Sequence, residues 1–310
     1  MIRIMPKRHE VNLSAVATME DERDRMMKGY IDVPVAPKAQ DARRTEAVKL
    51  YGPDAFEGMR HAGALTARCL DGVSGLIHHG TALTQIDAFV RDFAAAHDAT
   101  PATLGYQGYQ YACCTSVNHV VCHGFPNGKK LRDGDIVNVD VTLILDGWHG
   151  DSSRMYVVGK PKRAAERLIR IAHQAMMRGI EAVRPGAHLG DIGHAIQSHA
   201  HSERCSVVCD FCGHGIGQVF HDSPNILNFG KAGTGLELRE GMIFTVEPMI
   251  NLGRADVKML ADNWTAVTRD KSLSAQFEHS IGVTSDGFEI FTLSPNGLHA
   301  PGVGLQTVCA

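Results

Sequence analysis

The chain lacks any apolar run long enough to cross a lipid bilayer, for which roughly 20 consecutive apolar residues are needed. Its first 25 residues are charged and contain no apolar core segment, so they predict neither a signal peptide nor a membrane anchor. The formal net charge is only -3, which provides no global basic field for DNA or other nucleic acids. We therefore expect a cytoplasmic protein with no membrane partner and no DNA partner.

The sequence also lacks the pattern of a disulfide framework. Its 8 cysteines are scattered through 310 residues and do not form the dense, regular spacing of a small secreted scaffold. One local group, Cys205, Cys209 and Cys212 with His214, has the residue types of a zinc site, but no second pair of cysteines accompanies it. The alternative that we favour is a set of small, half-buried thiols along a strand in a reducing cytoplasm.

What the chain does contain is the composition of an ordinary globular protein, with 44% apolar and 21% charged residues and a length that allows a sizeable core. Residues 1–53 are polar and charged, and we predict that they form an N-terminal extension. Residues 54–310 then form the main domain. A helical pattern begins just after Asp54, which we expect to be the N-cap, with Glu57 completing a capping box.

A short pattern near residue 80 returns near residue 186. The spacing of apolar residues after Gly80, in GTALTQI, matches that after Gly186, in GAHLGDI, and in both places one amphipathic helix precedes the glycine and another follows it. Chance is the alternative for so short a frame. A β-rich stretch with a hairpin signal follows each helix pair, at Asp146-Gly147 and at Asp286-Gly287. We therefore predict an α+β fold made of two similar halves around one sheet.

Two aspartates stand in what otherwise resembles a buried hairpin, IVNVDVTLILDGWHGDSS at 136–153. If Asp146-Gly147 is a two-residue turn, Thr142 lies opposite Asp151, and Asp140 shares their face. Asp140 and Asp151 are then diagonal neighbours, with Cα atoms roughly 7–8 Å apart or less. Two carboxylates this close repel one another unless a cation lies between them. Either both face water on an open sheet or they belong to a site, and the apolar opposite face of the strand favours a site.

Three more candidate ligands follow later in the chain. His214 lies between two glycines, Glu247 interrupts an apolar strand directly before a proline, and Glu278 is a carboxylate within an alternating strand. With Asp140 and Asp151 they form a set of oxygen ligands and one imidazole, which suits divalent Mn, Fe, Co or Zn. Four carboxylates balance the charge of two such ions, the arrangement of hydrolytic two-metal sites.

Two further histidines lie in loops without carboxylates beside them. His123 occupies a Gly/Pro turn, and His221 follows His214 by 7 residues. Each is either an ordinary loop residue or, if the site is hydrolytic, a donor to a developing oxyanion or a leaving amine.

Five stretches together resemble the family of type I methionine aminopeptidases, whose pita-bread fold is shared by prolidases and creatinases. They are SVNHVVCHGFP (116–126), DGDIVNVDVTLILDGWHGDSSRMYVVG (133–159), CGHGIGQVFH (212–221), GMIFTVEPMI (241–250) and DNWTAVTRDKSLSAQFEHSIGVT (262–284). The resemblance implies helices packed on a central antiparallel sheet in two pseudo-symmetric halves. It also implies a metalloaminopeptidase that removes initiator methionine from nascent chains and peptides with a small second residue, using a hydroxide held by two metal ions.

The resemblance also implies a role for each candidate. Asp140 would chelate one ion, His214 and Glu247 would bind the other, and Asp151 and Glu278 would bridge both. Glu247 would in addition shuttle a proton, which makes it catalytic together with two histidines that contact the substrate and support the tetrahedral intermediate, His123 and His221. The methionine pocket that the resemblance implies is lined by Tyr106, Tyr109, Cys114, Phe220 and Trp264.

The chain departs from the family pattern at the rim of this pocket. Gln107 stands where histidine is expected, Gln110 where proline is common, and Thr103 where many relatives place a pocket cysteine. These differences leave the ligand set intact and bear on the preference of the pocket.

Two alternatives to this function stay open. A proline-directed peptidase of the same fold would normally carry a whole extra N-terminal domain, and a catalytically silent, ribosome-associated binding module would be expected to lose ligands. Type II enzymes carry a long insertion that is missing here, since Glu247 follows His221 by only 26 positions.

For the enzyme, the expected partners are N-terminal methionine peptides and nascent chains, with the ribosome as one setting. We expect a monomer with two divalent ions, Co, Mn, Fe or Zn.

Overall fold

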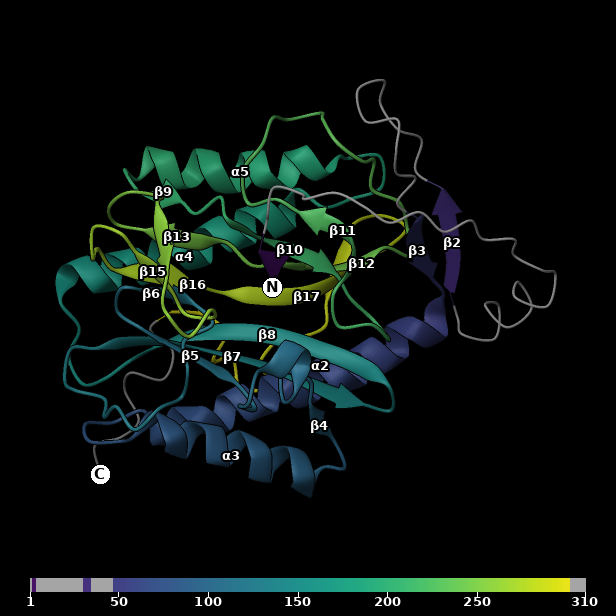
Figure 1. The fold of residues 1–310 in the computed structure, drawn as a ribbon. Helices are drawn as coiled ribbons and strands as arrows, with labels where there is room; N and C mark the ends of the chain where they lie inside the picture. The colour runs from purple at the N-terminus through teal and green to yellow at the C-terminus, as the bar shows by residue number, and fades with distance from the viewer. Residues whose placement is uncertain (1, 4–29, 35–46, 302–310) are drawn as a thin grey trace.

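A computed structural model describes residues 2–3, 30–34 and 47–301 of the chain. In this part, four α-helices lie on the two sides of a ten-stranded sheet (Figure 1). The helices are α2 (Pro53–Val73), α3 (Leu83–Ala96), α4 (Arg163–Glu181) and α5 (Leu189–Ser202), with short 3-10 turns at Ser74–Leu76 and Tyr106–Gly108. Most of the predicted extension, and Cys309, lie outside the described residues.

The strands are short except for one central hairpin. In chain order they are β1 (Ile2–Arg3), β2 (Tyr30–Pro34), β3 (Ala47–Tyr51), β4 (Thr100–Pro101), β5 (Cys114–Val117), β6 (Val120–Cys122), β7 (Ile136–Leu145), β8 (Trp148–Val157), β9 (Ser206–Val207), β10 (Phe211–Gly215), β11 (Asp222–Ile226), β12 (Ile243–Val246), β13 (Met249–Asn251), β14 (Val257–Met259), β15 (Ala266–Thr268), β16 (Ser274–Gln276), β17 (Glu278–Val283) and β18 (Phe288–Ile290).

The main sheet is antiparallel and joins the two halves of the chain at its centre. Its strands follow the order β1-β10-β12-β17-β8-β7-β4, with β11, β18 and β5 paired beside β10, β17 and β7. Helices α2 and α3 lie against β7, β8 and β4, whereas α4 and α5 lie on the other side of Figure 1, against strands of the second half. The predicted architecture, with helices packed on a central antiparallel sheet in two halves, is confirmed.

Local geometry recurs at the two glycines of the repeated sequence pattern. Gly80 and Gly186 both adopt a left-handed backbone, with φ of 89° and 82°. Each precedes a helix, α3 or α5, whose third residue accepts a hydrogen bond from the N-cap backbone: Gln85 in the first half and Asp191 in the second. A positive φ favours glycine, which explains why this residue recurs in both copies.

The predicted start of α2 is wrong by two positions, because Asp54 was expected to be the N-cap. Gly52 is the N-cap of this helix and makes no side-chain cap, while Pro53 is the first helical residue and Asp54 lies in the first turn. Proline suits that first position because its ring fixes φ at a helical value and its missing N–H has no partner within a helix. The Asp54 carboxylate still lies where it favours the positive end of the helix dipole.

The face of β7 that points away from the aspartates anchors the hairpin. Val137, Val139, Val141 and Leu143 are fully buried in one apolar cluster with residues of α2 and α3. The boundary at residue 54 stays a prediction, although the described strand β3 before it buries Val48 and Tyr51.

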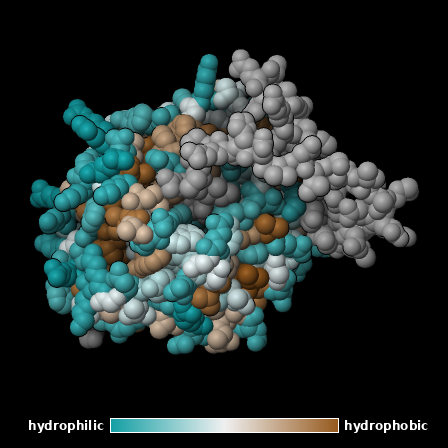
Figure 2. All heavy atoms as spheres, in the orientation of Figure 1, coloured by the Kyte–Doolittle hydropathy of each residue, from teal (hydrophilic) through white to brown (hydrophobic). Residues whose placement is uncertain are grey.

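None of the helices described here combines the length and the apolar character that a membrane span requires. On the face shown in Figure 2, hydrophilic residues form most of the outline and apolar ones gather toward the middle of the view.

Candidate metal centre

The first two carboxylates are held by the long β7–β8 hairpin. Its register pairs Leu145 with Trp148 around the Asp146-Gly147 turn, and Thr142 with Asp151, as the turn signal predicts. Asp140 pairs with Ser153 on the same ladder. The Thr142 hydroxyl donates a hydrogen bond of 2.7 Å to Asp151 Oδ1. The hairpin therefore fixes both carboxylates on one face of a rigid ladder.

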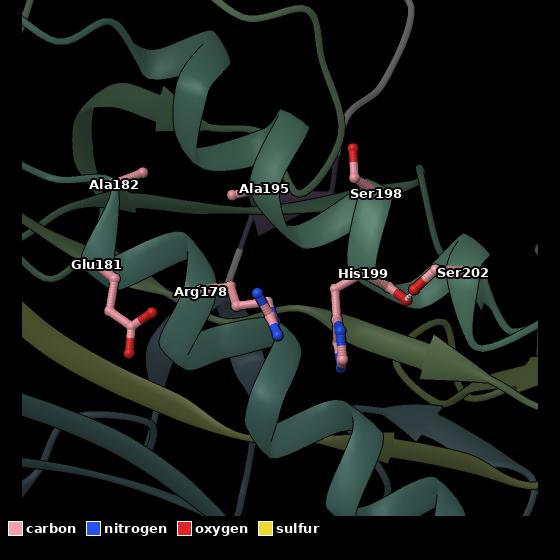
Figure 3. A pocket seen from close by; sticks show the side chains of 7 residues that line it. All are labelled: Arg178, Glu181, Ala182, Ala195, Ser198, His199 and Ser202. Atoms are coloured by element: carbon pink, nitrogen blue, oxygen red, sulfur yellow. Dashed lines mark hydrogen bonds between the residues drawn. The ribbon is translucent and has the colours of Figure 1, made fainter.

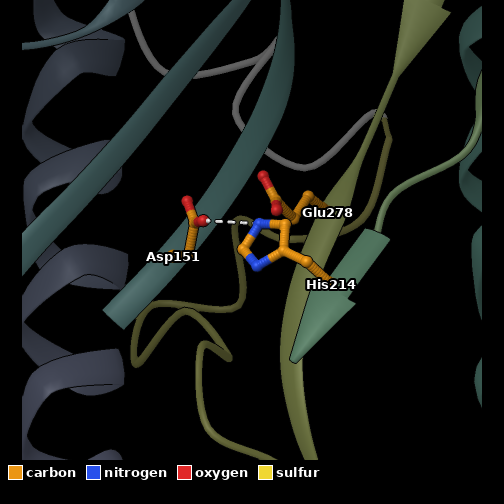
Figure 4. A group of neighbouring side chains, drawn as sticks. All are labelled: Asp151, His214 and Glu278. Carbon is orange, nitrogen blue, oxygen red and sulfur yellow. Dashed lines mark ion pairs between the residues drawn. The ribbon is translucent and has the colours of Figure 1, made fainter. Parts of the chain in front are cut away.

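The second half of the chain brings three more ligand-type residues to this face. His214 lies on β10, Glu247 directly follows β12, and Glu278 begins β17. One ligand atom each from Asp151, His214 and Glu278 lie within 4.8 Å of one another, and Figure 4 shows the three side chains converging from different strands. His214 Nε2 lies 3.6 Å from Asp151 Oδ2 and 3.6 Å from Glu247 Oε1. Asp140 lines the same pocket as Asp151.

The His214 ring is oriented for use as a ligand. Its Nδ1 lies 3.1 Å from the Gly215 carbonyl oxygen, the contact that a protonated Nδ1 makes, and its Nε2 faces the carboxylates. Burial lowers the pKa of His214 to about 4, although the neighbouring Asp151 acts in the opposite direction. A neutral imidazole with Nδ1 bound to a carbonyl presents Nε2 as the coordinating atom.

The carboxylates are buried deeply enough to require positive charge. Asp140 is 8% exposed and the other three are 2% exposed or less. Burial raises the pKa of Asp140, Glu247 and Glu278, and neighbouring carboxylates raise it further. Burial has the same effect on Asp151 and is the largest single influence, but several lowering interactions, among them those with His214 and the Thr142 hydroxyl, together outweigh it, so the pKa of Asp151 falls below its usual value. Four acids share one imidazole here, and divalent cations would supply the missing charge.

Two carboxylate oxygens support the same interpretation. Glu247 Oε2 and Glu278 Oε1 are buried and accept no hydrogen bond from a described residue. Buried carboxylate oxygens without donors are costly unless they coordinate a metal. The residues present therefore fit the two divalent ions that the sequence predicts.

In the metal-free protein, the contribution of Glu247 to stability should fall as the pH rises. Burial raises the pKa of Glu247 from its ordinary value of 4.5 to about 7, so the folded state holds a proton that the unfolded state releases. The stabilising contribution of this one group is full below about pH 4.5 and is lost, by about 3 kcal/mol, as the pH rises through 7. Thermal melts in EDTA between pH 5 and pH 8 measure this slope. We expect Glu247→Gln to flatten it, and Mn²⁺ to raise the melting temperature most at pH 8. A slope unchanged by Glu247→Gln contradicts the assignment.

A small pocket opens directly beside the carboxylates. It has room for about 40 Å³ and is lined by Thr103, Tyr106, Tyr109, Cys114, His123, Asp140, Thr142, Asp151, Phe220, His221 and Trp264. All the residues predicted for the methionine pocket are therefore among its walls. Cys114 pairs with Asp140 across β5 and β7, which places its thiol next to the first carboxylate. The wall is aromatic and sulfur-containing, a surface suited to a flexible apolar side chain.

The two predicted catalytic histidines line the pocket from opposite halves. The His123 ring packs edge-on against Phe211 and Trp264, and burial lowers its pKa to about 3. The His221 ring centre lies 4.3 Å from that of His214 and 4.0 Å from that of Phe220, and burial lowers its pKa as well. Both rings are therefore neutral near pH 7 and can donate a hydrogen bond without carrying charge.

A larger groove of about 520 Å³ lies elsewhere, between α4 and α5 (Figure 3). Its walls are Arg178, Glu181, Ala182, Ala195, Ser198, His199 and Ser202. It contains a single carboxylate, on the outer helices and away from the sheet. Clustered ligands, not cavity size, therefore locate the metal centre.

The cysteine group is not a metal site among the described residues. Burial raises the pKa of the Cys205, Cys209 and Cys212 thiols, and the group of ligand-type side chains found in the described part of the chain is Asp151, His214 and Glu278. Their neighbour His214 instead faces the carboxylates.

Sequence reasoning missed several residues that support the site. His149 is buried, its Nδ1 lies 2.8 Å from the Gly217 oxygen, and its ring stacks on Phe220. The Thr245 hydroxyl lies between the His214 N–H, which donates to it, and Glu247 Oε1, to which it donates. His149 alternates with Asp151 on β8, and this period of two was a signal that could have marked it.

Comparison with known proteins shows the family to which the chain belongs. Residues 57–285 match metallopeptidase family M24. The chain is 56% identical over 255 residues to a protein named methionine aminopeptidase from Rickettsia prowazekii (strain Madrid E). The matched region covers 82% of this chain and 98% of that protein. It is 45% identical over 249 residues to a methionine aminopeptidase of Escherichia coli (strain K12), covering 80% of this chain and 94% of that one.

Solved structures agree with this relationship. The crystal structure of methionine aminopeptidase from Rickettsia prowazekii superposes with a TM-score of 0.79 at 57% identity, over 79% of this chain and 100% of that one. A prolidase from Pyrococcus furiosus superposes with a TM-score of 0.59 at 19% identity, over 78% of this chain and 65% of that one. The second similarity shows the shared fold alone.

Proposed function

The chain belongs to metallopeptidase family M24, and on this premise we propose that it removes methionine from the N-terminus of polypeptides by metal-dependent hydrolysis. The observation that carries the proposal is the group of Asp151, His214 and Glu278, whose ligand atoms lie within 4.8 Å of one another beside an aromatic pocket. The high identity to methionine aminopeptidases over nearly their whole length supports the same activity.

Five side chains would hold the two divalent ions: Asp140, Asp151, His214, Glu247 and Glu278. When bound, such ions act as Lewis acids toward a carbonyl oxygen and lower the pKa of water. Metal-dependent hydrolysis follows from the family, whereas the identity of the metal, Co, Mn, Fe or Zn, is a separate question for the test below.

The other side chains would bind the substrate and move protons. The methionine side chain would enter the pocket between Tyr109, Cys114 and Trp264. Glu247, whose Oε1 accepts a hydrogen bond of 2.8 Å from the Thr245 hydroxyl, would also take up and return a proton. The neutral rings of His123 and His221 would donate hydrogen bonds to the oxygen on which negative charge develops at the scissile carbonyl.

Several finer assignments belong to the same proposal. The substrates would be nascent chains and peptides with a small second residue, met in the cytoplasm and at the ribosome, and the enzyme would act as a monomer. Residues 54–310 would form the catalytic domain. Thr103 lines the pocket, and its hydroxyl donates to the Tyr111 carbonyl at 2.9 Å, so it would present its methyl group to the substrate.

Release of methionine from a Met-Ala-Ser peptide tests the proposal directly. The purified full chain is stripped with EDTA and reloaded in turn with Mn²⁺, Co²⁺, Fe²⁺ or Zn²⁺, and an Xaa-Pro peptide is assayed in parallel. We expect methionine release that depends on added metal and little cleavage of the Xaa-Pro bond. Preference for the Xaa-Pro peptide would establish the proline-directed alternative. No release of methionine with any of the four metals would contradict the proposal, and fewer than two bound ions per chain would then indicate a silent binding module.

A further inference from the structure

The two halves of the sheet meet at one short ladder beside the metal centre. Strands β8 and β17 pair at only two positions, Glu278 with Ser153 and His279 with Ser152. The next position would pair Ser280 with Asp151. Asp151 and Glu278 come from opposite halves of the chain: Glu278 is in the first pair of this ladder, and Asp151 lies one position beyond its other end.

Beyond the last backbone pair, the side chain of Ser280 makes the hydrogen bonds between β17 and β8. Ser280 Oγ accepts the Asp151 N–H at 3.2 Å and donates to the Asp151 carbonyl oxygen at 2.7 Å. The backbone groups of Ser280 bond to partners other than Asp151. Its N–H donates to Thr292 Oγ1 at 3.2 Å, and its carbonyl accepts the Phe291 N–H at 3.0 Å. One hydroxyl thus satisfies both backbone groups of Asp151.

The chemistry of this contact is specific to a hydroxyl. Ser280 is 0% exposed and Asp151 is 2% exposed, so water does not replace either bond. A hydroxyl can donate and accept at the same atom, whereas an alanine at this position would leave a buried N–H and a buried carbonyl without partners. Loss of the hydroxyl would release Asp151 from the strand that carries Glu278.

We propose that Ser280 is a positioning residue of the metal centre, whose hydroxyl sets the spacing between the carboxylates of Asp151 and Glu278. The proposal rests on the function proposed above, in which these two carboxylates hold both ions. Ser280 would act through Asp151, because Ser280 itself does not line the pocket in which the substrate would bind. Ser152 makes a similar contact from β8, where its hydroxyl donates to the Glu278 carbonyl oxygen at 2.7 Å.

Metal affinity in the absence of substrate tests this role. Metal-free full chain is titrated with Mn²⁺ by calorimetry and with Co²⁺ by visible absorption, in the wild type and in Ser280→Ala and Ser280→Thr. Substitution of groups that orient metal ligands weakens binding by about 10–100-fold, and we expect a loss in that range for Ser280→Ala. We expect Ser280→Thr, which keeps the hydroxyl, to bind as tightly as the wild type. At saturating metal, kcat should recover in Ser280→Ala and KM should not change.

Thr66→Val is the matched control. The Thr66 hydroxyl is equally buried and donates to the Gly150 carbonyl at 2.8 Å, one residue from Asp151, but it joins α2 to β8 within one half of the chain. We expect this variant to lose thermal stability and keep its metal affinity. Equal weakening in Thr66→Val and Ser280→Ala would reduce Ser280 to an ordinary stabilising contact. Unchanged affinity in Ser280→Ala would overturn the proposal.

A further variant covers the case in which Ser280→Ala does not fold. The thiol of Ser280→Cys fills the same space but is a weak donor and acceptor, so it should weaken Co²⁺ binding and shift its absorption bands. Wild-type affinity and spectrum in Ser280→Cys would contradict the role. The titrations need no substrate, so they distinguish a failure of this proposal from a failure of the proposed activity, which would show as metal-loaded wild type that releases no methionine.

Discussion

Asp151→Asn is expected to lower kcat/KM for a Met-Ala-Ser peptide by about a thousandfold or more at any metal concentration. Asp151 lies 3.6 Å from His214 Nε2 and within the same 4.8 Å cluster as Glu278, and the family resemblance predicts that its carboxylate is shared between two ions. An amide has one acceptor oxygen and no charge, so it cannot replace a bridging carboxylate. Loss of several kcal/mol of charge stabilisation in the transition state corresponds to a factor of this size.

The matched control for this prediction lies in the same hairpin. Asp146 is exposed at the turn, with φ of 50°, a conformation that asparagine accepts readily, so Asp146→Asn should retain full activity. Calorimetry should show that Asp151→Asn binds fewer Mn²⁺ ions per chain than the wild type. Residual activity within tenfold of the wild type, with a full complement of metal, would contradict the bridging role.

The hairpin was the part of the site that could be predicted from residues alone. The Asp146-Gly147 turn sets the register of β7 and β8, and alternation then places Asp140 and Asp151 on one face. The opposite face is a run of buried valines, so a slip of one residue would turn the aspartates into the apolar cluster and the valines toward the metal centre. Local rules were sufficient here because turn chemistry and hydrophobic pattern require the same register.

The second half of the site could be predicted only as a set of candidates. His214, Glu247 and Glu278 were each unusual for their strands, but no local pattern states that β10, β12 and β17 meet β8. The approach of His214 to Asp151 depends on contacts between halves separated by dozens of residues. The family resemblance supplied that arrangement in advance, and the structure shows the strand order that produces it.

Two kinds of detail were beyond sequence reasoning. The start of α2 was misplaced because Asp54 and Glu57 matched a capping pattern, while Pro53 had the stronger preference for the first helical position. The bond between Ser280 and Asp151 joins a side chain to backbone groups 129 positions away, and serine in a strand carries no signal for such a contact. Supporting residues of this kind are defined by three-dimensional contacts alone.

His221→Ala is expected to lower kcat by about 10²–10³-fold and to leave KM and metal affinity nearly unchanged. His221 lines the pocket beside Asp151, follows the strand of His214, and packs between the rings of Phe220 and Tyr106. Burial lowers its pKa, so the ring stays neutral at working pH and can act as a donor to an oxygen that gains charge only in the transition state. Such a donor contributes to kcat and adds little to ground-state binding.

The control for His221 is an exposed histidine on α2. His61→Ala removes an imidazole from the surface and should not change the kinetics. Steady-state assays with Met-Ala-Ser at saturating Mn²⁺ give kcat and KM separately, and calorimetry gives the metal affinity of each variant. If His221→Ala raised KM and left kcat intact, the ring would serve to hold the substrate before reaction, because only an interaction formed in the transition state changes kcat alone. If metal affinity fell instead, the His221 ring would act mainly by holding His214 in place, because the two ring centres lie 4.3 Å apart.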